Sequence, residues 1–229
     1  MIATQPPIVV TWRWGTKYGL EYVDRLARGV HRHFYGLHRF VVITDDLSIP
    51  YEAWPIEAAD RPLTELKGCF ARLRMFDPAW QASHGIVPGQ RIVCIDLDAI
   101  VTGRLDELFE STADFLILQG ANASNPCPFN GSLFMLRAGA HADVWQGFSY
   151  REACKTRYHE FPDDQGWLWD RLPGAAGWKC GPDSGVYAFK KPGWPAGDEL
   201  PGGARLVAFP GWRDPSMFAH LPWVARHWC

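Results

Sequence analysis

Residues 91–98 read Arg91-Ile92-Val93-Cys94-Ile95-Asp96-Leu97-Asp98, an apolar run that ends in two acidic residues. This run is the most strand-like in the chain, and its unbroken apolar character is typical of a strand buried on both faces. In an open α/β sheet, ligands bind beyond the carboxyl ends of the strands. The sequence therefore predicts that Asp96 and Asp98 lie at a ligand-binding edge.

The spacing of the two acidic residues favours a metal site. Side chains two residues apart in an extended segment point the same way, so both carboxylates can face one point. Two carboxylates held together repel each other, and a hard divalent cation relieves that repulsion. Oxygen ligands suit Mg²⁺ or Mn²⁺, whose remaining coordination positions go to water and a diphosphate. We predict such a site on Asp96 and Asp98, and the alternative is a structural or solvated pair.

Apolar runs alternate with helical spacing on both sides of this segment. Strands are expected at residues 8–12, 39–44, 91–95, 114–118, 132–136 and 205–209, and helices at residues 20–33, 65–76, 140–150 and 163–172. This alternation predicts an α/β fold with a Rossmann-like, mostly parallel sheet flanked by helices. The length of 229 residues favours a single domain over residues 1–229. The Pro- and Gly-rich residues 192–203 are expected to form a long surface loop, with a mobile lid as the alternative.

The composition is that of an ordinary globular protein, with 47% hydrophobic and 21% charged residues. A formal net charge of -2 gives no broad electrostatic footprint for nucleic acid, so no nucleic-acid partner is expected. No stretch approaches the roughly 18 to 20 apolar residues that span a bilayer. The first residues lack the basic region and apolar run of a signal peptide, so a cytoplasmic protein is expected.

Cysteine, histidine and tryptophan give weaker signals. The six cysteines form no C-x-x-C pair, and Cys69 and Cys94 are expected to be small core residues. The eight histidines show no zinc-hydrolase spacing, and the chain has no phosphate-binding P-loop or nucleophile-elbow motif. The 12 tryptophans could line clefts that bind sugars or bases, or could form an aromatic-rich core; composition does not separate the two.

Several segments resemble known glycosyltransferases. Residues 94–101, followed by Gly103-Arg104-Leu105-Asp106-Glu107-Leu108-Phe109, resemble glycosyltransferase family 8, the group of glycogenin and bacterial galactosyltransferases, where this pattern carries a metal-binding D-x-D. Phe70-Ala71-Arg72-Leu73 is similar to that family's aromatic-x-Arg-Leu helix, whose arginine faces the donor site. Residues 14–18, 22–26 and 44–46 are similar to a group of related bacterial glycosyltransferases. At the level of motifs, the resemblance covers most of residues 8–228.

The resemblance implies a GT-A fold and a metal-dependent glycosyltransferase of the hexosyl, retaining type. Its donor would be a nucleoside-diphosphate sugar, with UDP as the expected nucleotide, and its acceptor a glycan, a lipid or a small molecule. The Mn²⁺ or Mg²⁺ ion would bridge both phosphates of the donor. Contacts to the nucleotide sugar are expected from Thr11, Trp12, Trp14, Lys17, Tyr18, Thr44, Asp45, Arg72, Asp96, Leu97, Ser132, Gly211, Trp212 and Arg213. Lys17 and Arg72 would stabilise the leaving diphosphate; the alternative for each is a surface salt bridge.

The resemblance also implies four catalytic candidates, which are Asn130, Asp163, Asp164 and Gln165. Asn130-Gly131-Ser132 matches a segment that lines the acceptor side of the donor sugar, and its alternative is a tight Asn-Gly turn. Asp163-Asp164-Gln165 resembles a motif that opens a helix and contacts the transferred sugar through its carboxylate. The alternative is a helix N-cap, and the two roles are compatible.

The last expected strand departs from the family. Relatives carry there a histidine that serves as the third protein ligand of the metal, whereas this chain has Pro210, which cannot bind a metal. Arg213 is a candidate for the family's phosphate-binding lysine, and Asp214 for the missing ligand. Two other functions therefore stay open. One is a catalytically silent nucleotide- or sugar-binding domain. The other is a haloacid-dehalogenase-like phosphatase with Asp96 as nucleophile, although two strands precede this D-x-D and Ile100 stands where Thr or Val is usual.

The C-terminal residues 217–228 are aromatic and weakly basic. Such a segment is expected to close over the core. The alternative is peripheral contact with the inner face of a membrane, where many bacterial glycosyltransferases meet their acceptors.

Overall fold

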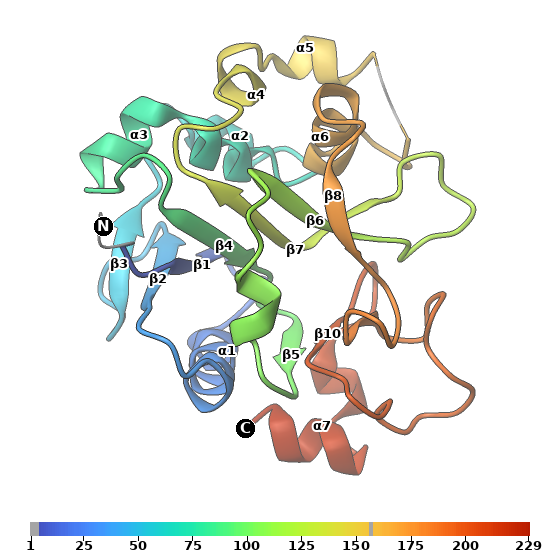
Figure 1. Ribbon diagram of the computed structural model, residues 1–229. Coiled ribbons are helices and arrows are strands. Elements are labelled where there is room, and N and C mark those ends of the chain that lie inside the picture. The colour runs from blue at the N-terminus through green and yellow to red at the C-terminus, as the bar shows by residue number, and fades with distance from the viewer. Residues whose placement is uncertain (1–4, 156–157) are drawn as a thin grey trace.

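A seven-stranded sheet forms the centre of the computed structural model, which describes residues 5–155 and 158–229 (Figure 1). Its strands follow the order β3-β2-β1-β4-β7-β6-β8, with bounds β1 Ile8–Arg13, β2 Arg39–Thr44, β3 Glu52–Pro55, β4 Arg91–Ile95, β6 Phe115–Gln119, β7 Phe129–Arg137 and β8 Ala176–Lys179. Strand β7 runs antiparallel to β4 and β6, and the other neighbouring pairs are parallel. The prediction of a mostly parallel α/β sheet is therefore confirmed.

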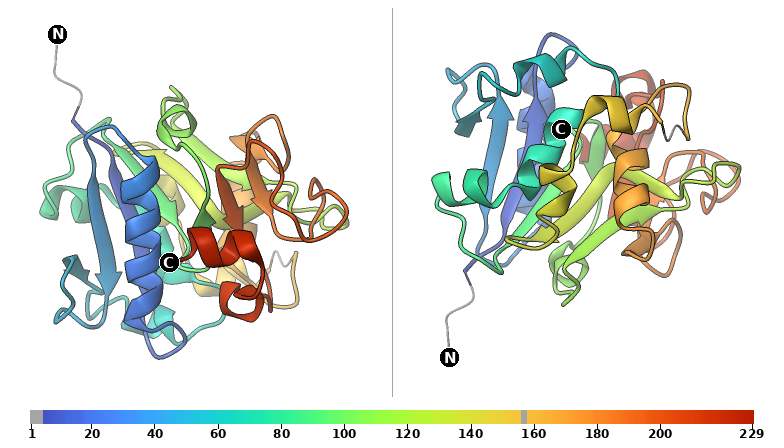
Figure 2. Two further views of the ribbon diagram at one scale, coloured as in Figure 1. Left: turned by 90° about the horizontal axis from the view of Figure 1, so that it is seen from below. Right: turned by 90° about the horizontal axis from the view of Figure 1, so that it is seen from above.

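Both faces of this sheet are apolar and both are covered. In β1, for example, Ile8 and Val10 belong to the core on one side and Val9 to the core on the other. Figure 2 shows α1 beneath the sheet and the helices that follow β3 and β7 above it. The helical segments are α1 Leu20–His33, α2 Arg61–Thr64, η1 Phe70–Phe76, α3 Pro78–Ser83, η2 Asp106–Phe109, α4 Asp143–Gln146, α5 Tyr150–Ala153, α6 Asp164–Arg171, η3 Pro215–Phe218 and α7 Pro222–His227.

A second, three-stranded sheet follows the D-x-D segment. Its order is β5 (Ala99–Val101), β10 (Leu206–Ala208) and β9 (Val186–Ala188), with β10 antiparallel to β5 and parallel to β9. This sheet and α7 enclose a third core, in which Trp223 and Trp228 are buried. Trp223 and Trp228 of the C-terminal segment thus turn inward, as expected for a segment that closes over the core.

Two expected helices differ in the structure. The expected helix 65–76 is broken, because Gly68 and Cys69 adopt left-handed backbone conformations with φ of 101° and 57°, and the chain resumes as the tighter η1. The expected helix 140–150 is replaced by α4 and by α5, whose N-cap Ser149 accepts a hydrogen bond from the Glu152 N–H. Residues 192–203, all of which the structure describes, contain neither helix nor strand, as expected.

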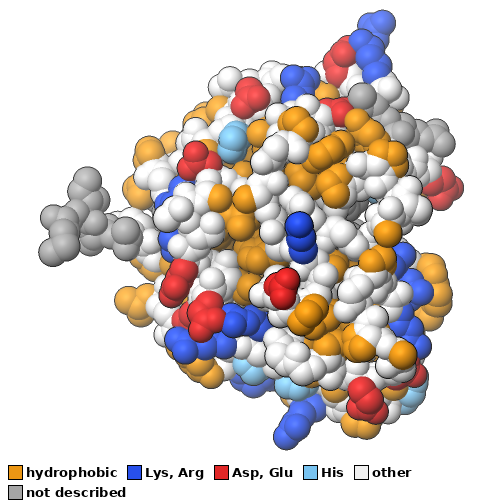
Figure 3. Space-filling model, turned by 45° about the vertical axis from the view of Figure 1, so that its right-hand side comes forward, with side chains coloured by type: hydrophobic (Ala, Val, Ile, Leu, Met, Phe, Trp, Pro, Cys, Tyr) orange, Lys and Arg blue, Asp and Glu red, His pale blue; other side chains and the backbone are white. Residues whose placement is uncertain are grey.

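The surface carries mixed charges. On the face shown in Figure 3, acidic and basic side chains are interspersed, with apolar side chains between them. This distribution differs from the single-sign stripe that accompanies nucleic-acid binding. Within the part of the chain that the structure describes, no helix is both long enough and apolar enough to cross a membrane.

Candidate functional site

The D-x-D pair lies at the carboxyl end of β4, in the middle of the sheet. The Asp96 N–H donates to the Ser132 carbonyl (3.0 Å), which extends the pairing of β4 with β7 by one residue. The Ala99 N–H then donates to the Asp96 carbonyl (3.1 Å) and turns the chain toward β5. Leu97 is buried between the two acids, whereas 32% of the Asp96 side chain is exposed. The predicted position of the two acids, at the carboxyl end of a strand of the sheet, is correct.

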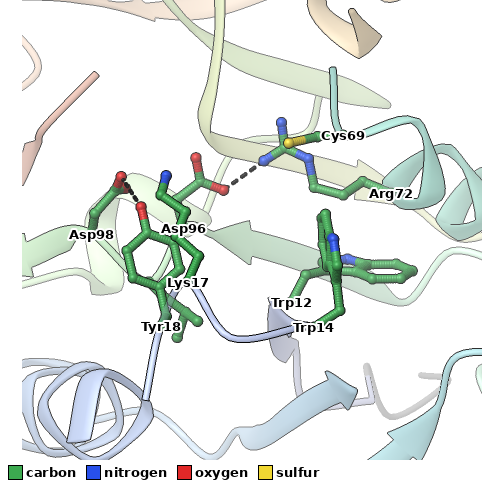
Figure 4. A pocket seen from close by; sticks show the side chains of 9 residues that line it. Trp12, Trp14, Lys17, Tyr18, Cys69, Arg72, Asp96 and Asp98 are labelled. Atoms are coloured by element: carbon green, nitrogen blue, oxygen red, sulfur yellow. Dashed lines mark hydrogen bonds and ion pairs between the residues drawn. The ribbon is translucent and has the colours of Figure 1, made fainter. Parts of the chain in front are cut away.

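A pocket of about 170 Å³ opens beside this pair, between the ends of β1 and β4 (Figure 4). It is lined by Trp12, Trp14, Lys17, Tyr18, Cys69, Arg72, Asp96, Leu97 and Asp98. Eight of these nine residues were predicted to contact a ligand. The ninth is Cys69, which the sequence assigned to the core. Burial raises the pKa of its thiol to about 12, so Cys69 contributes a neutral, unreactive surface to the pocket wall.

Arg72 is the buried centre of the site. Its Nε and Nη2 donate to Asp164 at 2.8 and 2.6 Å, and its Nη1 donates to Asp96 (2.5 Å) and to the Gly131 carbonyl (3.0 Å). Only 5% of the side chain is exposed. Burial alone would lower the pKa of Arg72, but the carboxylates of Asp164 and Asp96 raise it well above its ordinary value, so the group stays charged. Each nitrogen of the guanidinium already has a partner within the protein.

Two close approaches of the backbone make this arrangement possible. The Asp164 N–H donates to the Gly68 carbonyl (2.8 Å), and a Cβ at Gly68 would lie 2.3 Å from the Pro162 carbonyl oxygen. A Cβ at Gly131 would lie 2.3 Å from Nη2 of Arg72. Gly131 sits inside β7, where the register against β6 shifts, so Asn130-Gly131 forms an irregularity in a strand and not the tight turn of the alternative.

Asp98 is held from the side opposite to Arg72. The Tyr18 hydroxyl donates to Oδ2 of Asp98 (2.7 Å), as Figure 4 shows. Burial, followed by the negative charge of Asp96, raises the pKa of Asp98 to about 7. Burial also raises the pKa of Tyr18, so its hydroxyl keeps the proton that it donates. Each acid of the pair therefore has one oxygen engaged, by Arg72 for Asp96 and by Tyr18 for Asp98.

The remaining oxygens fit a metal that arrives with other ligands. The second oxygen of each carboxylate makes no hydrogen bond to the part of the chain that the structure describes. Across that same part, no group of three or more His, Cys, Asp or Glu side chains could hold a metal ion. Mg²⁺ is commonly bound through one or two carboxylates together with phosphates and water, and the pair Asp96 and Asp98 matches that pattern.

Asp214, the candidate for the missing third ligand, is engaged elsewhere. Its Oδ1 accepts hydrogen bonds from the Tyr22 hydroxyl (2.7 Å) and from the Ser216 N–H (2.8 Å), where it caps η3. Its role as a metal ligand stays a prediction.

No family model matches the chain, and no curated protein sequence does. Solved structures do match. The apo form of the glycosyltransferase GlyE from Streptococcus pneumoniae TIGR4 aligns with a TM-score of 0.61 at 12% identity, over 92% of this chain and 56% of that chain. The galactosyltransferase LgtC in complex with donor and acceptor sugar analogs aligns with a TM-score of 0.57 at 12% identity, over 96% of both chains. An active-site mutant of LgtC aligns at 0.59 and 11%, over 91% and 89%.

The chain has the GT-A fold. At identities of 11 to 13% the structural likeness shows the fold alone, and this chain spans 56% of the GlyE chain. Membership of family 8 stays a prediction.

Three further groups shape the ligand side of this GT-A domain. The exposed ammonium of Lys17 lies 4.5 Å from the centre of the Tyr18 ring and forms no ion pair with any described residue. The rings of Trp12 and Trp14 are nearly perpendicular, with centres 6.2 Å apart. The buried indole N–H of Trp12 has no hydrogen-bond partner among the described residues.

Other predicted contacts lie outside the pocket of the GT-A domain. Thr11 and Thr44 are buried in β1 and β2, and Ser132 is buried in β7. The carboxylate of Asp45 accepts from the Gly15 N–H (2.9 Å) and so anchors the loop that carries Trp14 and Lys17. Gly211, Trp212 and Arg213 lie on the loop after β10. Trp212 is 69% exposed, and the Arg213 guanidinium lies 5.1 Å from its ring.

The four catalytic candidates form the wall behind Arg72. Asp163 caps α6 by accepting from the Gly166 N–H (2.8 Å), and Gln165 accepts from the Gly131 N–H (3.0 Å) and donates to Asp163 (3.1 Å). Asn130 accepts from the Ser132 N–H (3.1 Å). Asp164 is 1% exposed, and its Oδ1 has no hydrogen-bond partner in the described part of the chain. The capping role of Asp163 is confirmed, and contact of these groups with a sugar stays a prediction.

Proposed function

We propose that this chain is a metal-dependent glycosyltransferase. It would transfer a hexosyl group from a nucleoside-diphosphate sugar, with UDP as the nucleotide, to a glycan, lipid or small-molecule acceptor. One observation carries the proposal: a single pocket at the sheet edge holds two carboxylates, an exposed ammonium and two indoles. The GT-A fold supports it, since similar structures are glycosyltransferases and one of them holds donor and acceptor sugar analogs.

The polar groups divide the work on the donor. A metal held by the free oxygens of Asp96 and Asp98 would supply Lewis-acid neutralisation of the departing diphosphate. Lys17 has an exposed ammonium that forms no ion pair with a described carboxylate, so it can bind a phosphate oxygen. Trp12 and Trp14 offer an apolar wall for a base or ribose. Arg72 holds Asp96 in place from behind.

We assign Asp164 and Gln165 to the side of the transferred sugar, because Asp164 binds Arg72, which holds Asp96, and Gln165 binds the N–H of Gly131, whose carbonyl also binds Arg72. Retention of configuration follows from the family resemblance alone. The cytoplasmic location and the contact of residues 217–228 with a membrane also stay predictions.

One observation favours a second function, a catalytically silent binding domain. Pro210 stands in place of a histidine ligand, and the described residues offer no third metal-binding side chain beside Asp96 and Asp98. The phosphatase alternative is weaker, because Asp96 would have to act as nucleophile while its Oδ1 is bound to buried Arg72.

A thermal-shift screen tests the donor site. UDP, GDP, CDP and ADP would each be added with Mn²⁺, with Mg²⁺ or with EDTA. A ligand at 100 times its Kd stabilises the folded state by about 2.7 kcal/mol, and for this size about 2 to 4 °C per kcal/mol is expected, so the midpoint should rise by about 5 to 10 °C. We expect the rise with UDP and metal together. No rise with any pair would contradict the proposal.

A turnover assay separates the two functions. A donor site that is active hydrolyses or transfers the sugar of its UDP-sugar slowly even without the natural acceptor, and released UDP can be measured. Binding of UDP with metal and no release from any UDP-sugar would favour the silent domain.

A further inference from the structure

Tyrosine hydroxyls bind aspartates at four places in the described chain, and one of these aspartates belongs to the candidate metal pair. The bonds are Tyr18 to Asp98 (2.7 Å), Tyr22 to Asp214 (2.7 Å), Tyr51 to Asp24 (2.6 Å) and Tyr158 to Asp170 (2.7 Å). Tyr18 lines the pocket, whereas Tyr51 and Asp24 do not. Tyr18 and Asp98 thus form a tyrosine–aspartate pair at the pocket, and Tyr51 and Asp24 form a pair of the same type away from it, which serves as a control.

Tyr18 is itself held from behind. Its ring packs on that of Tyr22, with centres 4.8 Å apart, and the Tyr22 ring packs edge-on against Trp228 at 5.3 Å. The Tyr22 hydroxyl is fixed by Asp214, the cap of η3. A continuous set of contacts therefore runs from the C-terminal segment through two tyrosines to Asp98.

We propose that Tyr18 is a positioning residue for the metal site, and that Tyr22, fixed by Asp214, holds Tyr18 in place. This inference rests on the proposed function, because it assigns the metal to Asp96 and Asp98. A carboxylate can rotate about its terminal bond and offer either oxygen. The hydroxyl of Tyr18 engages Oδ2 of Asp98, so Oδ1 is the oxygen that would be left to bind a cation.

The orientation of Asp98 by Tyr18 matters more here than it would in a metal site with three protein ligands. Only two carboxylates are available from the described residues, so a misdirected Asp98 would remove half of the protein's ligands. Asp96 is already fixed by Arg72 on its own Oδ1. Tyr18 gives Asp98 the equivalent support, and the contact through Tyr22 links the C-terminal segment to the metal site, although Pro210, which precedes that segment, cannot be a ligand.

The affinity for Mn²⁺ tests the proposal without an activity assay. It can be measured by titration calorimetry or from the electron paramagnetic resonance spectrum of free Mn²⁺. Loss of a group that hydrogen-bonds a metal ligand typically lowers metal affinity about 10- to 100-fold. Tyr18→Phe should therefore raise the Kd for Mn²⁺ by at least about 10-fold, both without nucleotide and with UDP present. Tyr51→Phe removes the same type of bond outside the pocket and should leave the Kd unchanged.

The role of Tyr22 is tested by a double-mutant cycle. Tyr22→Phe should weaken Mn²⁺ binding less than Tyr18→Phe does. In the Tyr18→Phe background, Tyr22→Phe should have almost no further effect, since residues that act through one another are not additive. Equal effects of Tyr22→Phe in the wild-type protein and in Tyr18→Phe would contradict the proposal that Tyr22 acts through Tyr18.

The outcomes separate this inference from the proposed function. A folded Tyr18→Phe protein that binds Mn²⁺ as tightly as wild type, or more tightly, would overturn the positioning role and leave the metal site standing. A wild-type protein that binds no Mn²⁺, with or without UDP, would overturn both. Loss of Mn²⁺ affinity in Tyr18→Phe, in a protein that turns over no UDP-sugar, would support the inference and contradict only the enzymatic proposal.

Discussion

Replacing Arg72 by methionine tests whether the site depends on one buried cation. Methionine keeps an apolar stem of similar length, but it removes the guanidinium, whose carbon lies 5.8 Å from the centre of the Phe134 ring, with all of its hydrogen bonds. The carboxylate of Asp164, whose side chain is 2% exposed, then has no cation beside it. The Asp96 carboxylate, at 32% exposure, can still be solvated.

The expected cost follows from this difference in burial. Removing one partner of a buried ion pair typically costs about 3 to 5 kcal/mol, because the remaining charge is left uncompensated. Arg72→Met should therefore lower the free energy of unfolding by that amount, and the midpoint should fall by about 6 to 20 °C at about 2 to 4 °C per kcal/mol. Asp164→Asn in the same chain removes the buried charge, so the double variant should recover most of the loss.

Urea unfolding at pH 7.5 measures these free energies. The control is Arg39→Met, which breaks the exposed ion pair with Glu52 and should cost less than about 1 kcal/mol. A cost for Arg72→Met as small as that of the control would refute the assignment of Arg72 as the buried centre of the site. Failure of Asp164→Asn to recover stability would show that the loss comes from packing and not from a buried charge.

Three other changes have defined outcomes. Asp98→Asn should abolish metal-dependent UDP binding in calorimetry while circular dichroism shows a folded protein, and wild-type binding of UDP with Mn²⁺ would make the D-x-D assignment wrong. Lys17→Ala should weaken UDP binding more than uridine binding; equal losses would contradict a phosphate contact. The hydrogen bond to Asp163 raises the pKa of His159 above its ordinary 6.5, so their contact stabilises the fold below about pH 6.5 and this stabilisation disappears as the pH rises through the raised pKa. His159→Gln should thus lower the free energy of unfolding more at pH 5.5 than at pH 8.5, and equal losses would contradict this linkage.

The bounds of strands and helices could be predicted from the sequence where the local pattern of residues agrees with their burial. Residues 39–44, 91–95 and 20–33 were predicted with the bounds of β2, β4 and α1, since these segments carry long apolar runs or regular helical spacing. The acidic pair was placed correctly because a strand end is a local feature. Eight pocket residues followed from the same edge rule and from the family resemblance.

Features that the sequence did not indicate depend on contacts between distant parts of the chain. Leu66, Phe70 and Leu73 have helical spacing, yet the helix is broken at Gly68 because the carbonyl of Gly68 binds the N–H of Asp164. The same contact brings Cys69 to the pocket wall. Strands β5 and β9 have three residues each, and their existence depends on pairing with β10 more than on their own composition.

Arg72 is the clearest case of a residue whose contacts could not be predicted from the sequence. Its place in the pocket was predicted, but its partners were not, because Asp164 lies 92 residues away in the chain. The family resemblance assigned its charge to the donor diphosphate. In the fold that charge is already used by Asp164 and Asp96, so phosphate binding would require Arg72 to share donors that these carboxylates hold.

The charge balance around the pocket then has a consequence for how a donor could bind. Burial raises the pKa of Asp98 and of Asp164 to about 7, so above that pH these two and Asp96 carry three negative charges, of which buried Arg72 offsets one. Exposed Lys17 adds a positive charge at the pocket, where water and salt screen it. A nucleoside diphosphate alone would therefore approach a site that already repels anions, and a divalent cation alone would find two protein oxygens. Each lowers the cost of binding the other, so the two should bind cooperatively, with a coupling that is equal in both directions. A missing histidine ligand therefore need not silence the site, because the diphosphate itself can complete the coordination that two aspartates begin.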